Sequence, residues 1–275
     1  MIKKLLQGYM ICNILSIDVA LGAVVSALFF GQILDIQIKL SGLVALGLTV
    51  WMIYTADHLL DARKIKHDAS TVRHRFHQRH FKVLVALLVL AAAGVFIQLF
   101  FIRRPVIIGG MILGWIVVIY FLTLKQLKYL KELAGAILYT GGVLVAPLSL
   151  SYFELSPPQL ILTLEFFITA LVNLLIFSWF DVDKDIEDDR KSFATYYGSK
   201  LTVRLVTGLL TLNVLLSLLV LLQYSSHGWE TLIILVMNMV LAALVALKKY
   251  FSNHDRYRIL GDAIFFFPIL YLLLK

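Results

Sequence analysis

Charged residues and cysteine are both scarce in this 275-residue chain, and each scarcity excludes a class of protein. Charged side chains make up only 15% of the residues and 60% are hydrophobic, which is too apolar for an ordinary soluble domain. Cys12 is the single cysteine, so an intramolecular disulfide is excluded. With five prolines and 16 glycines, no disordered tail or flexible linker stands out. The composition predicts a single integral membrane domain over residues 1–275.

Long apolar segments fill most of the chain, and each is about long enough to span a bilayer with some tilt. They lie near residues 9–34, 40–60, 83–102, 105–123, 132–153, 158–180, 201–223, 229–247 and 258–274. Lys3 and Lys4 precede the first segment, and no convincing cleavage site follows it. We therefore expect a retained helix rather than a signal peptide. The sequence predicts an all-α, polytopic fold with nine transmembrane helices.

The basic residues are distributed unevenly between the two sides of these helices. With the N-terminus inside, all but four of the 25 lysines and arginines lie on the inner side; the four are Lys39, Arg103, Arg104 and Lys275. Positive loops remain in the cytoplasm, so we expect a multi-pass protein of the cell inner membrane with a cytoplasmic N-terminus. The net charge of +8 suits anionic lipids or a phosphorylated substrate, and nucleic acid is not needed to explain it.

Two acidic clusters fall on this predicted cytoplasmic face. Asp57 and Asp61 end the second segment, and Asp181, Asp185 and Asp189 follow the sixth. Carboxylates four residues apart on a helix share one face, and paired carboxylates favour a shared cation. Two such helices facing each other would hold Mg²⁺, which bridges readily to a diphosphate. Carboxylates at helix ends are often only solvated caps, but two such clusters on the same face favour a functional site.

Metal-bound diphosphate is a good leaving group. If it is attached to an allylic isoprenoid, its departure leaves a carbocation that basic residues, an apolar tunnel and aromatic walls could accommodate. Arg63, Arg190 and Lys125 are candidates for the phosphate oxygens, and Tyr54 lies close to the first cluster.

Other polar residues inside the apolar segments have two open interpretations. Asp18 could line an acceptor pocket, and Asn173 lies about two helical turns before Asp181, where it could face the cavity. Asp18, Asn173, Glu165 and Asp262 could equally be polar groups that pack helices together. His74, His77 and His80 are spaced for a metal, but neighbouring arginines would repel one, so we expect a loop facing lipid or diphosphate.

Three stretches resemble the UbiA-type intramembrane prenyltransferase superfamily, which has two D-x-x-x-D motifs on the cytoplasmic ends of its second and sixth helices. The three are Tyr54–Lys64 (YTADHLLDARK), Asp181–Gly198 (DVDKDIEDDRKSFATYYG) and Lys125–Gly135 (KQLKYLKELAG). The resemblance implies nine helices around a central cavity open to the cytoplasm. It also implies Mg²⁺-dependent transfer of a polyprenyl group from a polyprenyl diphosphate to a lipophilic or aromatic acceptor.

By position, Asp57 and Asp61 match the first motif, and Asp181 and Asp185 match the second if Gly198 fixes the register. A competing register uses Asp185 and Asp189. The resemblance therefore implies a catalytic and metal-binding role for Asp57, Asp61, Asp181 and Asp185, with Asp189 as a further metal ligand. The resemblance also implies that Arg63 and Lys125 meet the diphosphate, since their positions are usually basic in the family. With the candidates named above, the expected substrate-binding residues are Arg63, Lys125, Arg190, Asn173, Tyr54 and Asp18.

The chain departs from the family pattern before each motif. The family often has Asn four residues before the first aspartate of a motif. This chain has Ile53 at that position before Asp57 and Phe177 before Asp181. An isoprenoid-binding relative that has lost catalysis therefore remains an alternative. So does an ion-coupled transporter, although its acids would lie nearer the membrane midplane.

Overall fold

The computed structural model describes residues 2–123 and 129–274, and within these ranges every regular element is a helix. Eight helical spans are long and apolar enough to cross a membrane. They are α3 (Leu40–Lys64), α5 (Phe81–Leu99), α6 (Arg104–Thr123), α7 (Lys131–Leu150), α8 (Pro157–Phe180), α11 (Ser199–Gln223), α12 (Gly228–Ala246) and the run of α14 (Arg256–Ala263) and α15 (Pro268–Leu274). The predicted all-α, polytopic membrane fold is confirmed.

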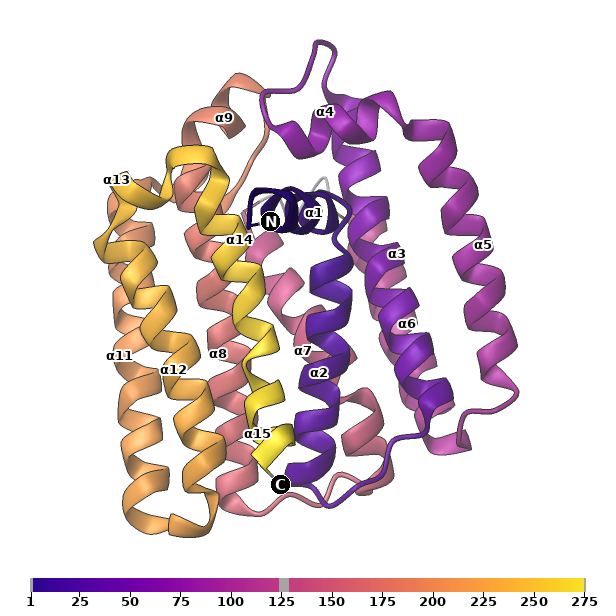
Figure 1. Ribbon diagram of the computed structural model, residues 1–275, viewed down its shortest axis with the longest axis vertical. Coiled ribbons are helices and arrows are strands. Elements are labelled where there is room, and N and C mark those ends of the chain that lie inside the picture. The colour runs from indigo at the N-terminus through magenta and orange to yellow at the C-terminus, as the bar shows by residue number, and fades with distance from the viewer. Residues whose placement is uncertain (1, 124–128, 275) are drawn as a thin grey trace.

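The first apolar segment is broken, which corrects the continuous helix predicted near residues 9–34. It forms α1 (Ile2–Ile14) and α2 (Ile17–Ile33), bent by 83°. Ser16, between them, has a φ of 56°, a left-handed conformation that a right-handed helix does not continue through. Figure 1 shows α1 lying across one end of the bundle while α2 runs along it. Only if this pair counts as one span does the number reach nine, so nine stays a prediction.

Helices α2, α7 and α8 form the centre of the bundle. Helix α8 packs against α7, α11 and α12, while α2 packs against α3, α7 and α15. Of the most apolar part of α8, 61% is buried, compared with 6% for α6. Helix α5 lies at one edge and α11 and α12 lie at the other (Figure 1). Because the exposed side chains of α6 are apolar, its outer surface is suited to lipid.

Short helices collect at the end of the bundle where α1 lies. They are α4 (Val72–Arg79), α9 (Val182–Glu187) and α13 (Lys248–Phe251) (Figure 1). The loop after α3 carries α4 back over the bundle, and α9 follows α8 directly. This end therefore brings the two aspartate clusters of the sequence close together.

Candidate active site

The first aspartate pair lies in the last turns of α3 and shares a lysine. Lys131 Nζ, at the start of α7, lies 3.1 Å from Asp57 Oδ2 and 2.7 Å from Asp61 Oδ2. One cation reaches both carboxylates because residues four apart project from the same helical face. The other oxygen of Asp57, Oδ1, is buried and accepts no hydrogen bond from the described residues.

The second pair lies across a helix junction. Helix α8 ends at Phe180, and Asp181 links it to α9 with a φ of −91° and a ψ of 4°. The Asp185 amide donates to the Asp181 carbonyl at 2.8 Å, so the two residues remain one turn apart. The Asp181 carboxylate accepts hydrogen bonds from the Tyr257 hydroxyl and the Arg258 guanidinium, both on α14. This carboxylate is therefore held mainly by the C-terminal span.

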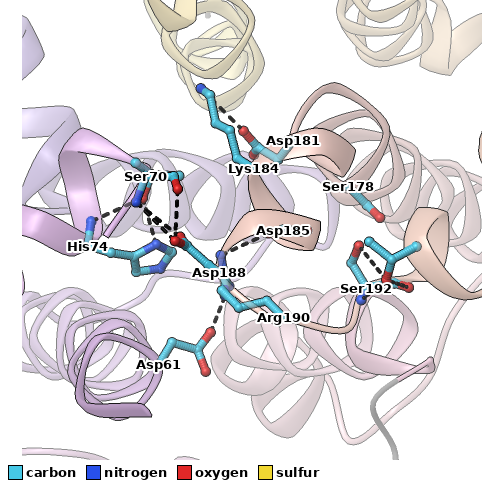
Figure 2. A network of polar contacts seen from close by, with 12 residues as sticks. Asp61, Ser70, His74, Ser178, Asp181, Lys184, Asp185, Asp188, Arg190 and Ser192 are labelled. Atoms are coloured by element: carbon cyan, nitrogen blue, oxygen red, sulfur yellow. Dashed lines mark hydrogen bonds and ion pairs between the residues drawn. The ribbon is translucent and has the colours of Figure 1, made fainter. Parts of the chain in front are cut away.

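Arg190 connects the two pairs, as Figure 2 shows. Its Nη2 lies 2.8 Å from Asp61 Oδ2 and its Nη1 lies 3.1 Å from Asp185 Oδ1. Burial alone would lower the pKa of Arg190, but Asp61 and Asp185 outweigh it and raise that pKa above its ordinary value. Burial raises the pKa of the Asp185 carboxyl, and Arg190 offsets this only in part. The site could therefore accommodate more positive charge than it holds.

A second contact fixes the loops that carry these residues. The Asp188 carboxylate, after α9, accepts hydrogen bonds from the backbone amide of Ser70 at 3.0 Å and from its hydroxyl at 2.9 Å. Ser70 precedes α4, so the bond joins the chain after α3 to the chain after α8 (Figure 2). Asp188 thus helps to hold the two aspartate pairs at a fixed separation.

One cavity joins the charged end to the apolar interior of the bundle. Charged residues from both motifs face it, together with cations from α4, α7 and α14. Those charged residues include Asp57, Asp181, Asp185, Arg73, Lys131, Arg190 and Arg258. Deeper in, the lining is apolar and aromatic and includes Val19, Leu138, Tyr139, Ala170, Leu174 and Phe265. The cavity can therefore take a molecule with an anionic head and an apolar body.

The structure brings most of the predicted site residues to this cavity. Tyr54 and Asn173 line it, and so do Ile53 and Phe177, the two positions at which the family often has Asn. The Oδ1 atom of Asn173 is buried without a hydrogen-bond partner among the described residues. Asp18 is also buried, but it lies behind the wall rather than in the lining.

Three predicted residues are placed elsewhere or cannot be placed. Asp189 and Arg63 are exposed and are not part of the cavity lining. Asp189 has a φ of 50° and forms the turn after which Arg190 points back toward Asp185. Lys125 lies outside the described residues.

Sequence reasoning missed four charged residues of the cavity lining, Arg73, Lys131, Glu132 and Arg258, and it gave Asp262 no role in the site. Lys131 was counted only as a cytoplasmic charge, although it lies six residues beyond Lys125 in the same motif-like stretch. Arg258 and Tyr257 come from the last span, which has no motif. Their only sequence signal was a pair of polar residues opening an apolar segment.

The histidines that lie together in the structure are not the three that are evenly spaced in the sequence. His74 and His77 of α4 pack against His58 of α3, with ring centroids 5.8 Å and 5.2 Å apart, while His80 is exposed. Burial, with Arg190 nearby, lowers the pKa of His74 well below its usual range. Within residues 2–123 and 129–274, no three His, Cys, Asp or Glu side chains are arranged to hold a metal ion by themselves.

Comparison with known proteins gives similarity in structure but not in sequence. No family model matches the chain, and no curated protein matches it. Among solved structures, a UbiA homolog from Aeropyrum pernix K1 in its apo form aligns with a TM-score of 0.65 at 14% identity, covering 95% of this chain and 98% of that one. A digeranylgeranylglyceryl phosphate synthase aligns with a TM-score of 0.54 at 15% identity, covering 96% and 97%.

These alignments extend over almost the full length of each chain, so they cover the whole bundle as well as its aspartate-bearing end. The resemblance first carried by the aspartate motifs is thereby confirmed in three dimensions, and the chain has the UbiA-type fold.

Proposed function

We propose that the protein is a membrane prenyltransferase that moves a polyprenyl group from its diphosphate to a lipophilic or aromatic acceptor with the help of Mg²⁺. One observation carries this proposal: three of the four aspartates and three cations line one cavity whose interior is apolar, and the fourth aspartate, Asp61, is bound to two of those cations. Its shape and polarity match a diphosphate attached to an isoprenoid chain. The solved structures of similar fold, a UbiA homolog and a digeranylgeranylglyceryl phosphate synthase, support the same activity.

The carboxylates suit magnesium. Mg²⁺ prefers oxygen ligands and is often held by only one or two carboxylates together with substrate phosphates. Each aspartate pair could therefore serve one ion, and the free, buried Oδ1 of Asp57 is a ligand atom available for it. Asp57 and Asp61 would hold one ion, and Asp181 and Asp185 the other. Bound magnesium would neutralise the charge that develops on the departing diphosphate.

The protein's own cations have a distinct role. Lys131, Arg190 and Arg258 line the cavity beside the carboxylates, where they can donate hydrogen bonds to diphosphate oxygens. Tyr54 and Phe177 lie between this charged end and the apolar lining. Aromatic faces at that position would stabilise an allylic cation by cation–π attraction. The apolar interior would exclude water, which otherwise competes with the acceptor for the cation.

Orientation in the membrane completes the proposal. The basic residues gathered at the α4 and α9 end favour a cytoplasmic location for this end and for the N-terminus. The diphosphate would then be drawn from the cytoplasm and the prenyl chain from the bilayer. We propose the cell inner membrane as the location of the protein.

The direct test is binding and release of diphosphate by purified protein in detergent. Geranyl, farnesyl and geranylgeranyl diphosphates would be offered with Mg²⁺ and, in parallel, with EDTA. We expect binding that requires Mg²⁺ and that disappears in Asp57→Ala. Asp183→Asn is the matched control, because this exposed acid of α9 lies outside the cavity.

Two results would contradict the proposal. If folded wild-type protein bound none of these diphosphates, the prenyl-donor assignment would be lost. If Asp57→Ala and Asp183→Asn weakened binding equally, the effect would come from surface charge rather than from the cavity.

A further inference from the structure

A second polar cluster lies beside the cavity and takes no part in holding the diphosphate. Its centre is Asn13, whose side-chain Nδ2 donates to Asp18 Oδ2 at 2.6 Å and to Asp262 Oδ2 at 2.8 Å. Arg73 Nη2 donates to the Asn13 side-chain oxygen at 2.9 Å and lies 3.6 Å from Asp262 Oδ2. All four residues are buried. One asparagine thus ties two carboxylates from opposite ends of the chain to a single arginine.

The break between α1 and α2 makes this cluster possible. The left-handed turn at Ser16 brings Asn13 of α1 and Asp18 of α2 to the same point, which α14 reaches with Asp262. Both oxygens of Asp18 are satisfied, because its Oδ1 also accepts from the Val19 amide at 2.9 Å. Asp18 therefore anchors the cluster from behind and leaves Asp262 as the member that faces the cavity with Arg73.

Asp262 presents its carboxylate to the cavity. Its Oδ2 accepts from Asn13, and the residue is part of the cavity lining. Two carboxylates share one guanidinium here, so the cluster has one negative charge in excess. Arg258, also in the cavity lining, is already bound to Asp181. The wall at Asp262 therefore offers a fixed hydrogen-bond acceptor to a donor in the cavity.

Asn173 gives an independent sign of a ligand at the same wall. It is 97% buried, and its Oδ1 accepts no hydrogen bond from the described residues. A Cβ built on Gly261, the residue before Asp262, would lie 2.5 Å from this oxygen, so the amide is directly beside that part of α14. A buried polar atom without a partner is costly. Asn173 and Asp262 both line the cavity, so a ligand with a hydrogen-bond donor at this wall would satisfy the Asn173 oxygen beside the Asp262 carboxylate.

The surroundings define the chemistry of that ligand. A ligand carboxylate has no hydrogen to donate to Asn173 Oδ1 or to the Asp262 carboxylate, and Asp262 would repel it. A ligand ammonium group would be repelled by Arg73, which also lines the cavity. A neutral hydroxyl donates without either penalty. Val19, Phe265 and Tyr139 line the cavity nearby, so the rest of the ligand is apolar.

We propose that Asp262 and Asn173 form the acceptor subsite of this cavity and that they select an uncharged, hydroxyl-bearing lipophilic acceptor. The inference rests on the proposed prenyl transfer, since it names the class of its second substrate. Asn13, Asp18 and Arg73 are positioning residues that fix the Asp262 carboxylate.

The test compares matched probes on the full chain in lipid nanodiscs, with empty nanodiscs to subtract partitioning into lipid. One pair is 4-nonylphenol and 4-nonylbenzoate, and the other is 1-O-hexadecylglycerol and hexadecanoate. We expect the hydroxyl member of at least one pair to bind about tenfold tighter than its carboxylate, the effect of one hydrogen bond to a charged group. Asp262→Asn should remove this preference. Glu165→Gln is the matched control, because Glu165 is a buried acid of α8 outside the cavity lining.

The same preparations are also tested for Mg²⁺-dependent binding of prenyl diphosphates, which separates the two proposals. Loss of the hydroxyl probe with retained diphosphate binding in Asp262→Asn supports the subsite. Hydroxyl selectivity in a protein that binds no diphosphate would leave the subsite standing and overturn the prenyl transfer. Carboxylate probes that bind as tightly as their hydroxyl partners in the wild type would overturn the subsite, whether or not Asp262→Asn folds. So would an unchanged preference in folded Asp262→Asn.

Discussion

The two aspartate pairs share one spacing in the sequence but are held in different ways. Asp57 and Asp61 lie on a continuous helix and share Lys131. Asp181 and Asp185 lie across the junction of α8 and α9, and Asp181 is held by Tyr257 and Arg258 of α14. The first pair thus depends on one neighbouring helix start, and the second depends on the last span of the chain. The same sequence spacing therefore does not imply that the same structural elements hold the two carboxylate pairs in place.

The largest expected effect is one that the two pairs share. Asp57→Ala and Asp181→Ala should each abolish the proposed prenyl transfer while the fold is kept, since each would remove a metal ligand from one half of the proposed diphosphate site. Turnover is measured as diphosphate release, and folding as elution of a single species in detergent. Full activity in both variants would end the assignment.

Stability should separate the two pairs. Arg258→Met leaves the buried Asp181 carboxylate without its arginine, and we expect a loss of about 3–5 kcal/mol. Lys131→Met should cost less, because Asp61 keeps Arg190 and because the Asp57 side chain is 18% exposed, compared with 3% for Asp181, so that water can partly replace the lysine. Thermal unfolding of both variants in the same detergent measures the difference. A larger loss in Lys131→Met would show that the first pair, not the second, is the structurally dependent one.

Arg190 tests whether the pairs act together. Arg190→Gln removes the only ion pairs of the described residues that connect Asp61 to Asp185, and it also removes a donor to diphosphate oxygens. We expect donor affinity to fall by about tenfold. Lys200→Gln, an exposed cation outside the cavity lining, provides the comparison in a titration with a prenyl diphosphate. Equal losses would mean that only overall charge matters.

A smaller effect should come from pH. Because the pKa of His74 lies well below its usual value in the folded protein, a proton binds the unfolded chain more readily. Stability should therefore be complete above about pH 6.5 and fall below it, by at most about 1.4 kcal/mol per pH unit. Melting temperatures between pH 8 and pH 5 measure this slope, and His74→Gln should make it shallower. A slope that is unchanged in His74→Gln would assign the acid sensitivity to other groups.

The smallest effect on donor binding is expected for residues that belong to the motif-like stretches but do not line the cavity. Asp189→Asn and Arg63→Gln should leave Mg²⁺-dependent donor binding within a factor of about two, since both side chains are exposed. Asn also tolerates the left-handed backbone at position 189. A loss in Asp189→Asn as large as that in Asp57→Ala would favour the Asp185 and Asp189 register.

The spans and the first aspartate pair could be predicted because they depend on local patterns. Apolar length fixed the helices, and a spacing of four on a continuous helix placed Asp57 beside Asp61. The second pair was less accessible. The end of the sixth apolar segment at residue 180 was predicted and agrees with the end of α8 at Phe180, but nothing in DVDKD signals that a separate helix, α9, begins after Asp181. The break at Ser16 was not predicted either, because the contacts that accompany it, between Asn13, Asp18 and Asp262, join residues up to 249 positions apart.

The cations of the site were also only partly predictable from the sequence. Arg63 was favoured because it follows the first motif, yet a residue two positions after Asp61 on a helix points away from its face. Lys131 and Arg258 reach the carboxylates from other helices. No local pattern connects residues 70 or more positions apart, so these partners appear only when the helices pack.

The cations around the four aspartates also affect how the protein is made. Lys131, Arg190 and Arg258 already neutralise much of the acidic charge, unlike a zinc finger, in which the metal itself drives folding. A newly synthesised chain can therefore complete its fold in the membrane before any divalent ion arrives. If magnesium and diphosphate bind there as proposed, they would have to replace existing ion pairs, so their occupancy should depend on ionic strength while the fold does not.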